Sequence, residues 1–267
     1  MLITRTCNIL VSITLCFTLA LASASTHANT VWTIGDSRVD GFRPDYESYR
    51  FDLWKNFIVN NLDIDLVGSN TDEANYPTFN GRQFDRNHDG YGGAQTTDFL
   101  PVIDELAGSV SSADFVLIGI GGNDLVESNQ STPQVVANIG TLIDRIRLFH
   151  PRAIFIVEQI ARARSDMMTP SLTSKLQEFN GRIATLAIQK STPASRVISV
   201  NMDAGWSDEF LADTVHYNAA GAKLVADRYF NTLRSIISNE DPINPSPPVE
   251  EPDPSIAFIP AVLSLLL

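Results

Sequence analysis

The chain has 267 residues, of which 31 are Asp or Glu and 19 are Lys or Arg, so its formal net charge at pH 7 is −12. A surface with this excess of carboxylates repels nucleic acid and anionic membranes, and it favours substrates that are uncharged or weakly charged. Residues 29–239 lie between two ends of different composition. They have the length of a single domain and contain no visible repeat.

The first 28 residues have the composition of a secretory signal peptide. Arg5 is their only charged residue, an apolar stretch runs from Ile9 to Ala22, and small residues allow cleavage after Ala24 or Ala28. We therefore predict that residues 1–28 are removed and that the protein is secreted, to the cell exterior or the periplasm. A buried N-terminal helix is the alternative.

Both cysteines of the chain, Cys7 and Cys16, lie inside this first segment. The mature protein would then contain no cysteine. Disulfide bonds, thiolate metal sites and a cysteine nucleophile are excluded on that prediction.

Beyond the signal segment, short apolar runs alternate with segments of helical period. The runs are rich in β-branched residues and carry few charges, which is typical of strands buried on both faces. Strand, helix and strand in repetition predict a three-layer α/β/α fold around a five-stranded parallel sheet, and ligands bind such sheets beyond the carboxyl ends of the strands. The predicted strands are Val31–Ile34, Ile64–Val67, Phe115–Ile120, Ile154–Ile160 and Val197–Val200, and the helical segments are Tyr46–Ile58, Val135–Phe149, Leu172–Ala187 and Ala219–Ile237.

The longest stretch without a period is Ser69–Gln95, which is polar and contains several aromatic residues. Loops of this length in compact domains are usually functional or disordered. We predict that this loop forms an ordered wall of the active-site cleft. The alternative is a surface segment packed by its own aromatic side chains.

The composition changes again near the C-terminus. Residues 240–255 are rich in proline and acidic residues, so they predict an extended linker without a core of its own. Residues 256–267 are mostly apolar but too few to span a bilayer as a helix. They fit a sorting or anchoring signal, or a chain that stops partway into a longer segment.

Two motifs near opposite ends of the domain contain the residue types of a hydrolytic triad. Ser37 follows the first predicted strand in the motif GDSRVDG, at the point where a strand turns into a helix. Asp213 and His216 lie in DTVH, just before the last helix. A serine hydroxyl needs a base to remove its proton, and the base needs a group that orients it. Ser37, His216 and Asp213 are therefore the candidate nucleophile, base and orienting acid.

A third motif, GGND, supplies Asn123 at the end of the third predicted strand. Its amide is the type of donor that stabilises an oxyanion. The lysine that a phosphate-binding loop requires does not follow, which argues against nucleotide binding. Asp36 is expected to fix the turn at Ser37 through hydrogen bonds to the backbone and to lie near the substrate.

The other two histidines outside the signal segment have different surroundings. His150 lies at the end of a helix, before a proline, and is expected to cap that helix. His88 lies in the long loop, from which it could contact the substrate. His150 has no carboxylate at the spacing that Asp213 has from His216.

The motif GDSRVDG, a glycine before a helix, GGND and DTVH follow one another along the chain in this order. Together they resemble the sequence blocks of the SGNH (GDSL-type) hydrolase superfamily, which has a flavodoxin-like α/β fold. The resemblance spans Val31–Ile237, so residues 29–239 are identified as the hydrolase domain. It implies that Ser37, Asp213 and His216 form the triad and that the backbone of Ser37 and the side chain of Asn123 donate to the oxyanion. The glycine donor of the family would be Gly93 in HDGYGGAQTTDF, before a helix that starts at Thr96, with Gly92 as the alternative.

A narrower resemblance is to family 3 carbohydrate esterases, which include acetylxylan esterases. It rests on YRFDLWKNF, IDLVGSN and HDGYGG. The chain departs from the family's pattern at Tyr91, Gly92 and Ala94, so contacts with substrate there are expected to differ.

The resemblance implies a secreted serine esterase that hydrolyses O-acetyl esters on a polysaccharide such as acetylated xylan, or on a small ester, without a metal or other cofactor. Membrane insertion of the domain is not expected, and the oligomeric state stays open. Two alternatives remain. One is a lipase, lysophospholipase or thioesterase of the same superfamily, and the other is a carbohydrate-binding protein without catalysis.

Overall fold

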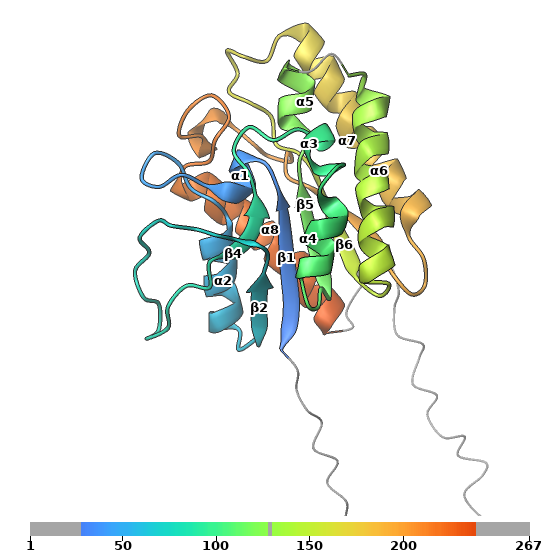
Figure 1. Cartoon of the computed structure of the whole chain (residues 1–267). Helices are drawn as coiled ribbons and strands as arrows, with labels where there is room; N and C mark the ends of the chain where they lie inside the picture. Colours follow the sequence, from blue (N-terminus) through green and yellow to red (C-terminus); the bar gives the residue numbers. More distant parts are fainter. Residues whose placement is uncertain (1–27, 128–129, 239–267) are drawn as a thin grey trace, which may run out of the picture.

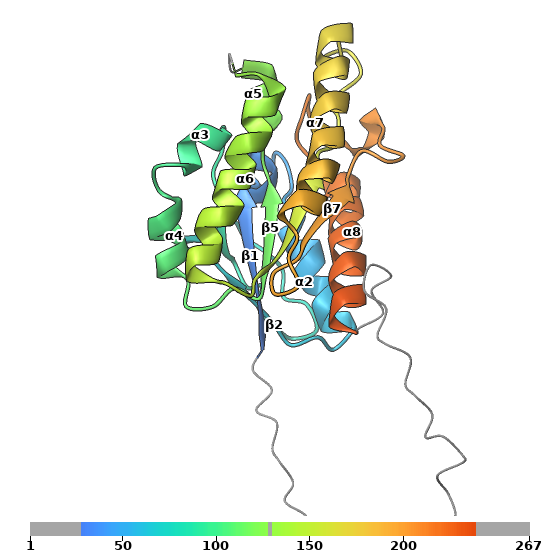
Figure 2. The ribbon, with the colours of Figure 1, turned by 90° about the vertical axis from the view of Figure 1, so that its right-hand side faces the viewer.

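The computed structural model describes residues 28–127 and 130–238. They form three layers, with a central sheet between two layers of helices, as predicted (Figures 1 and 2). The predicted signal peptide, linker and C-terminal tail lie outside the described residues, except for Ala28. None of the helices within the described ranges is long and apolar enough to cross a membrane.

The sheet has seven strands rather than the five that the sequence predicts. The strands are β1 (Asn29–Gly35), β2 (Ile64–Val67), β3 (Asn70–Thr71), β4 (Asn87–Gly90), β5 (Phe115–Gly119), β6 (Ile154–Gln159) and β7 (Val197–Asn201). All five predicted strands are present and parallel, and the main order is β3-β4-β1-β5-β6-β7. β1 pairs on one edge with β5 and on the other with two strands in succession, β2 along its first half and β4 at its carboxyl end.

The two strands that sequence reasoning missed lie in the segment expected to be a loop. β4 is parallel to β1, and β3 pairs with β4 in the antiparallel direction. β4 escaped prediction because it reads Asn-His-Asp-Gly, with no apolar residue, although its last three residues are buried. Hydrogen bonds replace apolar packing there: the Trp32 indole N–H donates to Asp89 Oδ2 at 2.6 Å, and the Ser69 backbone N–H donates to the same oxygen at 3.0 Å.

Helices cover both faces of the sheet. They are α1 (Ser37–Asp40), α2 (Arg50–Val59), α3 (Thr96–Phe99), α4 (Ile103–Ser109), α5 (Gly122–Glu127), α6 (Thr132–Phe149), α7 (Pro170–Lys190) and α8 (Ala219–Ile237), with one 3₁₀ turn, η1 (Asp208–Phe210). α4, α6 and α7 pack on one face and α2 and α8 on the other (Figure 2). Alternation along the strands divides the core, since Val116 and Ile118 of β5 face the first group while Phe115 and Leu117 face the second.

The long helices begin and end at the residues that their sequence signals indicate. The Ser131 side chain caps α6 by accepting from the Gln134 N–H. α6 ends at Phe149, and His150 is its C-terminal cap residue, directly before Pro151, as expected. The Asn218 side chain accepts from the backbone of Ala220 and Gly221 at the start of α8. α2 starts later than its period suggested, so Tyr46 lies in the preceding loop and not on the helix.

The expectation that Ser69–Gln95 forms a wall of the active-site cleft is wrong for Tyr76 and Phe84. Tyr76 and Phe84 pack in the core formed with α2, with ring centroids 4.9 and 5.2 Å from that of Phe51. These aromatic side chains pack the segment against α2. This is close to the alternative stated above, a segment packed by its own aromatic side chains. The segment therefore extends one edge of the sheet and the core beneath it.

One helix supplies a matched test of the core. Leu142 of α6 is fully buried, whereas Leu148 of the same helix is 78% exposed. We expect Leu142→Ala to lower the free energy of unfolding by about 2–5 kcal/mol and Leu148→Ala to change it by less than about 0.5 kcal/mol. Urea denaturation followed by circular dichroism measures both. Equal effects of the two substitutions would contradict the burial of this face of α6.

Candidate active site

The carboxyl end of β1 brings Ser37 to the rim of the sheet. β1 ends at Gly35, where an added Cβ would lie 2.0 Å from the carbonyl oxygen of Gly119 in β5, so only glycine fits. Asp36 follows and caps α1, because its Oδ1 accepts from the Arg38 N–H at 3.0 Å. This confirms that Asp36 fixes the turn. Ser37 is the first residue of α1, so the turn presents its hydroxyl at the rim.

Ser37, His216 and Asp213 meet although the serine and the histidine are 179 residues apart. His216 Nε2 lies 2.8 Å from Ser37 Oγ, and His216 Nδ1 lies 2.7 Å from Asp213 Oδ2. The other carboxylate oxygen, Oδ1, accepts from the backbone N–H groups of Val215 and His216 at 2.8 and 2.7 Å. Partial burial opposes ionisation of Asp213, but the hydrogen bonds from His216 and Val215 outweigh it and lower its pKa below the usual value. The arrangement is that of a catalytic triad.

Arg38 joins the three loops that carry the site, a role that sequence reasoning missed. Its Nε donates to the Val215 carbonyl at 2.8 Å, and its Nη1 donates to the Ala161 carbonyl at 2.7 Å. These bonds tie the turn after β1 to the loop after β6 and to the loop that carries His216. A charged residue directly after the candidate nucleophile is the signal that could have suggested this role.

Tyr46 covers one face of the His216 imidazole. The two ring centroids are 3.8 Å apart, and the planes are inclined by only 12°. The Glu47 N–H donates to the Tyr217 carbonyl at 2.9 Å, which holds the loop of Tyr46 against the loop of His216 (Figure 1). Sequence reasoning placed Tyr46 on a helix because its spacing from Tyr49 and Leu53 matches a helical period, so this contact was missed.

Asn123 lies in the first turn of α5, with its amide beside the loop of Gly93. Its Nδ2 donates to the Ala94 carbonyl at 2.9 Å. The next residue, Asp124, is buried and accepts from the backbone N–H and the hydroxyl of Thr96, which holds this loop against α5. Gly93 has a φ of +75°, a conformation that favours glycine, and its N–H has no partner among the described residues.

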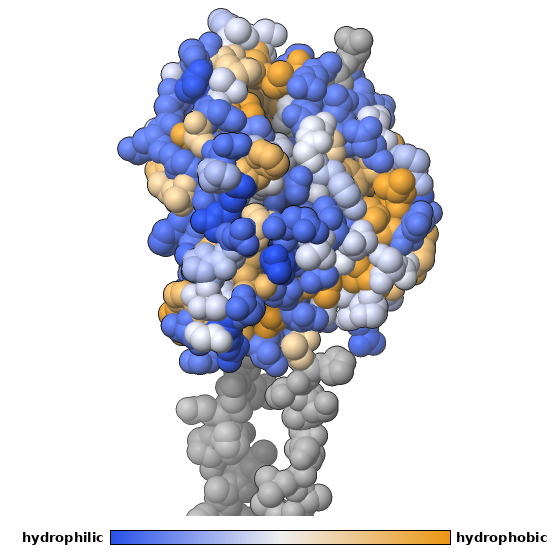
Figure 3. All heavy atoms as spheres, turned by 60° about the vertical axis from the view of Figure 1, so that its left-hand side comes forward, coloured by the Kyte–Doolittle hydropathy of each residue, from blue (hydrophilic) through white to orange (hydrophobic). Residues whose placement is uncertain are grey.

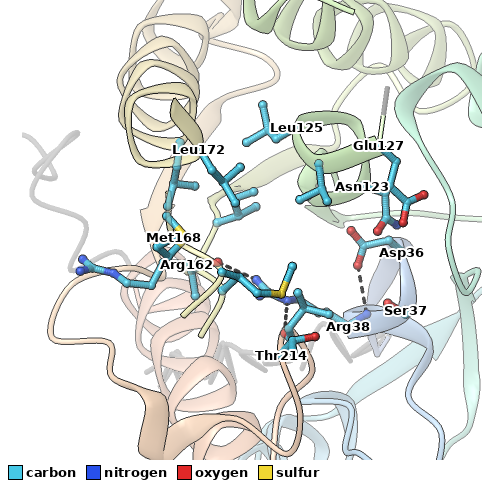
Figure 4. A pocket seen from close by; sticks show the side chains of 18 residues that line it. Asp36, Ser37, Arg38, Asn123, Leu125, Glu127, Arg162, Met168, Leu172 and Thr214 are labelled. Atoms are coloured by element: carbon cyan, nitrogen blue, oxygen red, sulfur yellow. Dashed lines mark hydrogen bonds between the residues drawn. The ribbon is translucent and has the colours of Figure 1, made fainter. Parts of the chain in front are cut away.

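A cavity of about 190 Å³ opens beside Ser37. Asp36, Ser37 and Asn123 lie on one side of it, and apolar side chains from α5, α7 and the loop before α7 form the other side (Figure 4). These apolar residues are Leu125, Val126, Met167, Met168, Leu172 and Leu176. The site therefore combines a candidate nucleophile, amide donors and an apolar chamber.

The sequence of residues 33–224 matches the GDSL-like lipase/acylhydrolase family. The chain belongs to this family. It is therefore a serine hydrolase that acts on ester bonds, as the resemblance implied. No match to a curated protein sequence is significant.

Solved structures of the same fold include two family 3 carbohydrate esterases and an acetyl esterase. A family 3 carbohydrate esterase from Talaromyces cellulolyticus matches with a TM-score of 0.69 and 23% identity, over 79% of this chain and 99% of that chain. An acetyl esterase variant solved with an acetate ion matches with a TM-score of 0.69 and 23% identity, over 80% of this chain and 100% of that one. A family 3 carbohydrate esterase from Clostridium thermocellum matches with a TM-score of 0.62 and 22% identity, over 78% of this chain and 98% of that chain. These likenesses establish the fold that the GDSL-like chain shares with them.

Of the four residues predicted to bind substrate, Asp36 lies in the wall of the cavity and His88 does not contact it. His88 is fully buried, and its Nδ1 accepts from the Gly90 N–H at 3.0 Å. Burial lowers the pKa of His88 to about 3, so its ring is neutral. The prediction for His88 is therefore wrong, because the residue lies inside the sheet beneath the site and exposes no surface to a ligand.

Tyr91 and Gly92 lie outside the wall of this cavity. Tyr91 is partly exposed, donates its hydroxyl to Asp89 Oδ1 at 2.8 Å and lines a separate hollow on α3 and α4. The Gly92 N–H donates to Asp40 Oδ2 at 3.2 Å. Their contact with substrate stays a prediction. Within the described residues, no group of three or more His, Cys, Asp or Glu side chains is arranged to hold a metal ion.

A buried carboxyl group lies beneath the turn of Ser37. Glu158 of β6 is 3% exposed and accepts a hydrogen bond from the Tyr229 hydroxyl at 2.7 Å. Burial raises its pKa from 4.5 to about 7. The folded protein therefore holds a proton between these two pH values that the unfolded chain releases, so this group lowers stability as pH rises through that window.

We expect Glu158→Gln to remove this part of the pH dependence. The amide keeps the acceptor for Tyr229 but cannot ionise, so the variant should match the wild type near pH 4.5 and exceed its free energy of unfolding by up to about 3 kcal/mol above pH 7. Chemical denaturation at a series of pH values measures the difference. Glu105→Gln, at an exposed position, serves as the control. A constant difference across this pH range would show that Glu158 does not titrate there.

Proposed function

We propose that the protein is a secreted serine esterase that hydrolyses O-acetyl esters of a carbohydrate, such as acetylated xylan, through an acyl-enzyme on Ser37. The observation that carries the proposal is the chain of hydrogen-bonding distances from Ser37 Oγ to His216 and on to Asp213, at the mouth of a cavity. A serine with no base would be inert at neutral pH.

In the first half of the reaction, Ser37 Oγ attacks the carbonyl carbon of the ester, while His216 Nε2 takes the hydroxyl proton. The tetrahedral intermediate collapses, the bond to the alcohol oxygen breaks, and His216 gives the proton to that oxygen. Asp213 holds the imidazole in orientation and stabilises its charged form. In the second half, His216 Nε2 takes a proton from water while the water oxygen attacks the acyl carbon. The bond from that carbon to Ser37 Oγ then breaks, His216 returns the proton to Ser37 Oγ, and the acid is released.

The negative oxygen of each tetrahedral intermediate would accept from the backbone N–H groups of Ser37 and Gly93 and from the Asn123 amide. Asn123 Nδ2 carries two hydrogens, and only one is needed for its bond to Ala94. Gly93 contributes an N–H that has no partner among the described residues. Such donors stabilise charge that develops only during the reaction, so they act on the rate of the chemical step.

The acetylated carbohydrate is supported by similarity. Two of the solved structures that share the fold are described as family 3 carbohydrate esterases, and a third is described as an acetyl esterase with an acetate ion. The acidic composition also disfavours substrates of high negative charge. The proposal that the protein is exported rests on residues 1–28 alone. Residues 256–267 support a further proposal, that the exported protein is attached to the cell surface.

Substitutions at two residues test the proposed roles. We expect Ser37→Ala to abolish the burst and turnover of an aryl acetate, because no nucleophile remains. We expect Asn123→Ala to lower kcat about 100- to 1,000-fold with little change in KM, because the donor acts in the transition state. Ser109→Ala, at an exposed serine, is the matched control. Full activity of Ser37→Ala would refute the mechanism, and an unchanged kcat of Asn123→Ala would remove Asn123 from the oxyanion site.

The substrate class is tested by acetate release from acetylated xylan, with Ser37→Ala alongside. Release by the wild type and not by the variant supports both the nucleophile and the polymer. Cleavage of a small aryl acetate without release from xylan would retain the esterase but direct attention to other acetylated carbohydrates.

The apolar side of the cavity supports a second candidate, a GDSL-type lipase or thioesterase that accepts longer acyl chains. A volume of about 190 Å³ exceeds the space that a two-carbon acyl group needs, and Leu125, Met168 and Leu172 would contact additional methylene groups. Each buried methylene contributes about 0.8 kcal/mol, or roughly fourfold in kcat/KM.

A series of ethyl esters of acetate, butyrate and octanoate separates the two candidates. For a carbohydrate acetylesterase we expect kcat/KM to be highest for acetate. A rise in kcat/KM of roughly fourfold for each added methylene group would instead support the second candidate.

A further inference from the structure

Phe42 is the most exposed of the large aromatic side chains among the described residues, at 61%. It lies beside Tyr46, with ring centroids 6.1 Å apart and planes inclined by 38°. Tyr46 in turn stacks on the candidate base His216. The Phe42 ring lies next in line after Tyr46 and His216, and because it is exposed it contributes little to the stability of the core. Its position suggests contact with a substrate.

The mechanism decides which part of the substrate would lie there. His216 Nε2 delivers its proton to the oxygen of the leaving alcohol, so the alcohol must lie beside His216. The cavity wall contains Ser37 and Asn123 but not His216, which suits the acyl group. We propose that Phe42, Asp45 and Tyr46 form a ledge that binds the neutral sugar ring of the leaving alcohol. This inference rests on the proposed function.

The ledge is held in place by its backbone. The Tyr46 and Asp45 N–H groups donate to the Phe42 carbonyl at 3.1 and 2.9 Å, and the Phe42 N–H donates to the Tyr46 carbonyl at 3.2 Å. An ion pair between Arg43 and Glu47 at 3.0 Å braces the segment internally, and the backbone bond from Glu47 to Tyr217 fixes it to the loop of His216. The aromatic rings are therefore pre-organised, which reduces the entropy lost when a ligand binds.

The chemistry of the ledge suits a neutral polyhydroxylated ring. The aromatic faces can pack against the apolar C–H face of a pyranose, and the exposed Asp45 carboxylate offers an acceptor for a hydroxyl group. Partial burial raises the pKa of Tyr46, and the nearby carboxylates of Asp40 and Asp213 raise it further. The surroundings of the Tyr46 ring are therefore negatively charged. A leaving alcohol that carries a phosphate, as in a lysophospholipid, would be repelled.

The surface beside the ledge is consistent with this chemistry. Figure 3 shows this side of the molecule: hydrophilic residues make up most of the face, and the hydrophobic residues are gathered in several areas, the larger of them toward the right and in the hollow near the top. A lipid would need a wider apolar rim at the entrance. The carboxylates of Asp45 and Asp213 near Tyr46 favour a neutral sugar over a negatively charged lipid headgroup on this side of the site.

The test compares one ester that has a sugar ring with one that lacks it. The substrates are glucose pentaacetate and ethyl acetate, and the variants are Phe42→Ala and Phe42→Trp, with Leu148→Ala as a control at an exposed apolar residue of α6. We expect Phe42→Ala to raise KM for the sugar ester about five- to tenfold and so lower the ratio of kcat/KM for the sugar ester to that for ethyl acetate. Phe42→Trp should restore the ratio, because it retains an aromatic face, and Leu148→Ala should leave it unchanged.

An equal loss of kcat/KM for both esters, or no loss for either, overturns the ledge while leaving the esterase in place. Binding of xylotriose, which has no ester, gives a readout that is independent of catalysis. Calorimetric titration of Ser37→Ala should show binding that the double variant Ser37→Ala, Phe42→Ala loses. If the wild type cleaves no ester yet binds xylotriose through Phe42, the proposed function fails and the sugar site remains. If xylotriose binds both variants equally or neither, the sugar site is refuted.

Discussion

The close contact between β1 and β5 at their carboxyl ends is the constraint on which the site depends. Gly35 lies so near the Gly119 carbonyl that no side chain fits, and the Asp36 N–H then donates to that carbonyl at 3.2 Å. The chain must turn away from the sheet at this point, and Asp36 caps the turn. The hydroxyl of Ser37 is thus presented by rigid backbone rather than by a mobile loop, which is the pre-organisation that catalysis needs.

The triad also needs a loop from the other end of the chain to reach this turn, and polar contacts hold that loop there. Arg38 donates to carbonyls after β6 and before His216, while Tyr46 packs on the imidazole and its neighbour Glu47 bonds to Tyr217. Each of these contacts comes from residues just after the nucleophile. The segment from Ser37 to Glu47 therefore supplies the hydroxyl, positions the base and forms the side of the site on which the alcohol would leave.

The two sides of the site differ in polarity, and this difference organises the proposed function. Leucine and methionine side chains from α5, α7 and the preceding loop form one side of the chamber next to Asn123, and the wall of the chamber also contains Arg38, Glu127 and Arg162. Aromatic rings among carboxylates lie on the His216 side. An acyl group prefers the apolar chamber, and a neutral polyhydroxylated alcohol prefers the aromatic and polar side. One ester can therefore bind with its carbonyl at Ser37 and one part on each side.

Much of this molecule was predictable because its signals are local. Buried parallel strands read as apolar runs, and glycine, proline and capping residues mark where the helices end, so the five main strands and the long helices were found. The candidate triad and the oxyanion donor Asn123 were also predictable, since Ser37 and Asn123 follow the carboxyl ends of strands and His216 precedes a helix cap. Parallel strands bring such positions to one edge of a sheet.

Only the tertiary structure decided the parts whose partners are distant in sequence. β4 is polar, and its burial depends on hydrogen bonds from Trp32 and Ser69 that no period along the chain reveals. For the same reason His88 was taken for a surface residue, although it lies inside the sheet with a neutral ring. Tyr46 has the spacing of a helical residue, but stacking on His216 requires it to lie in a loop. Sequence determines what a residue can offer chemically, while packing determines which group it meets.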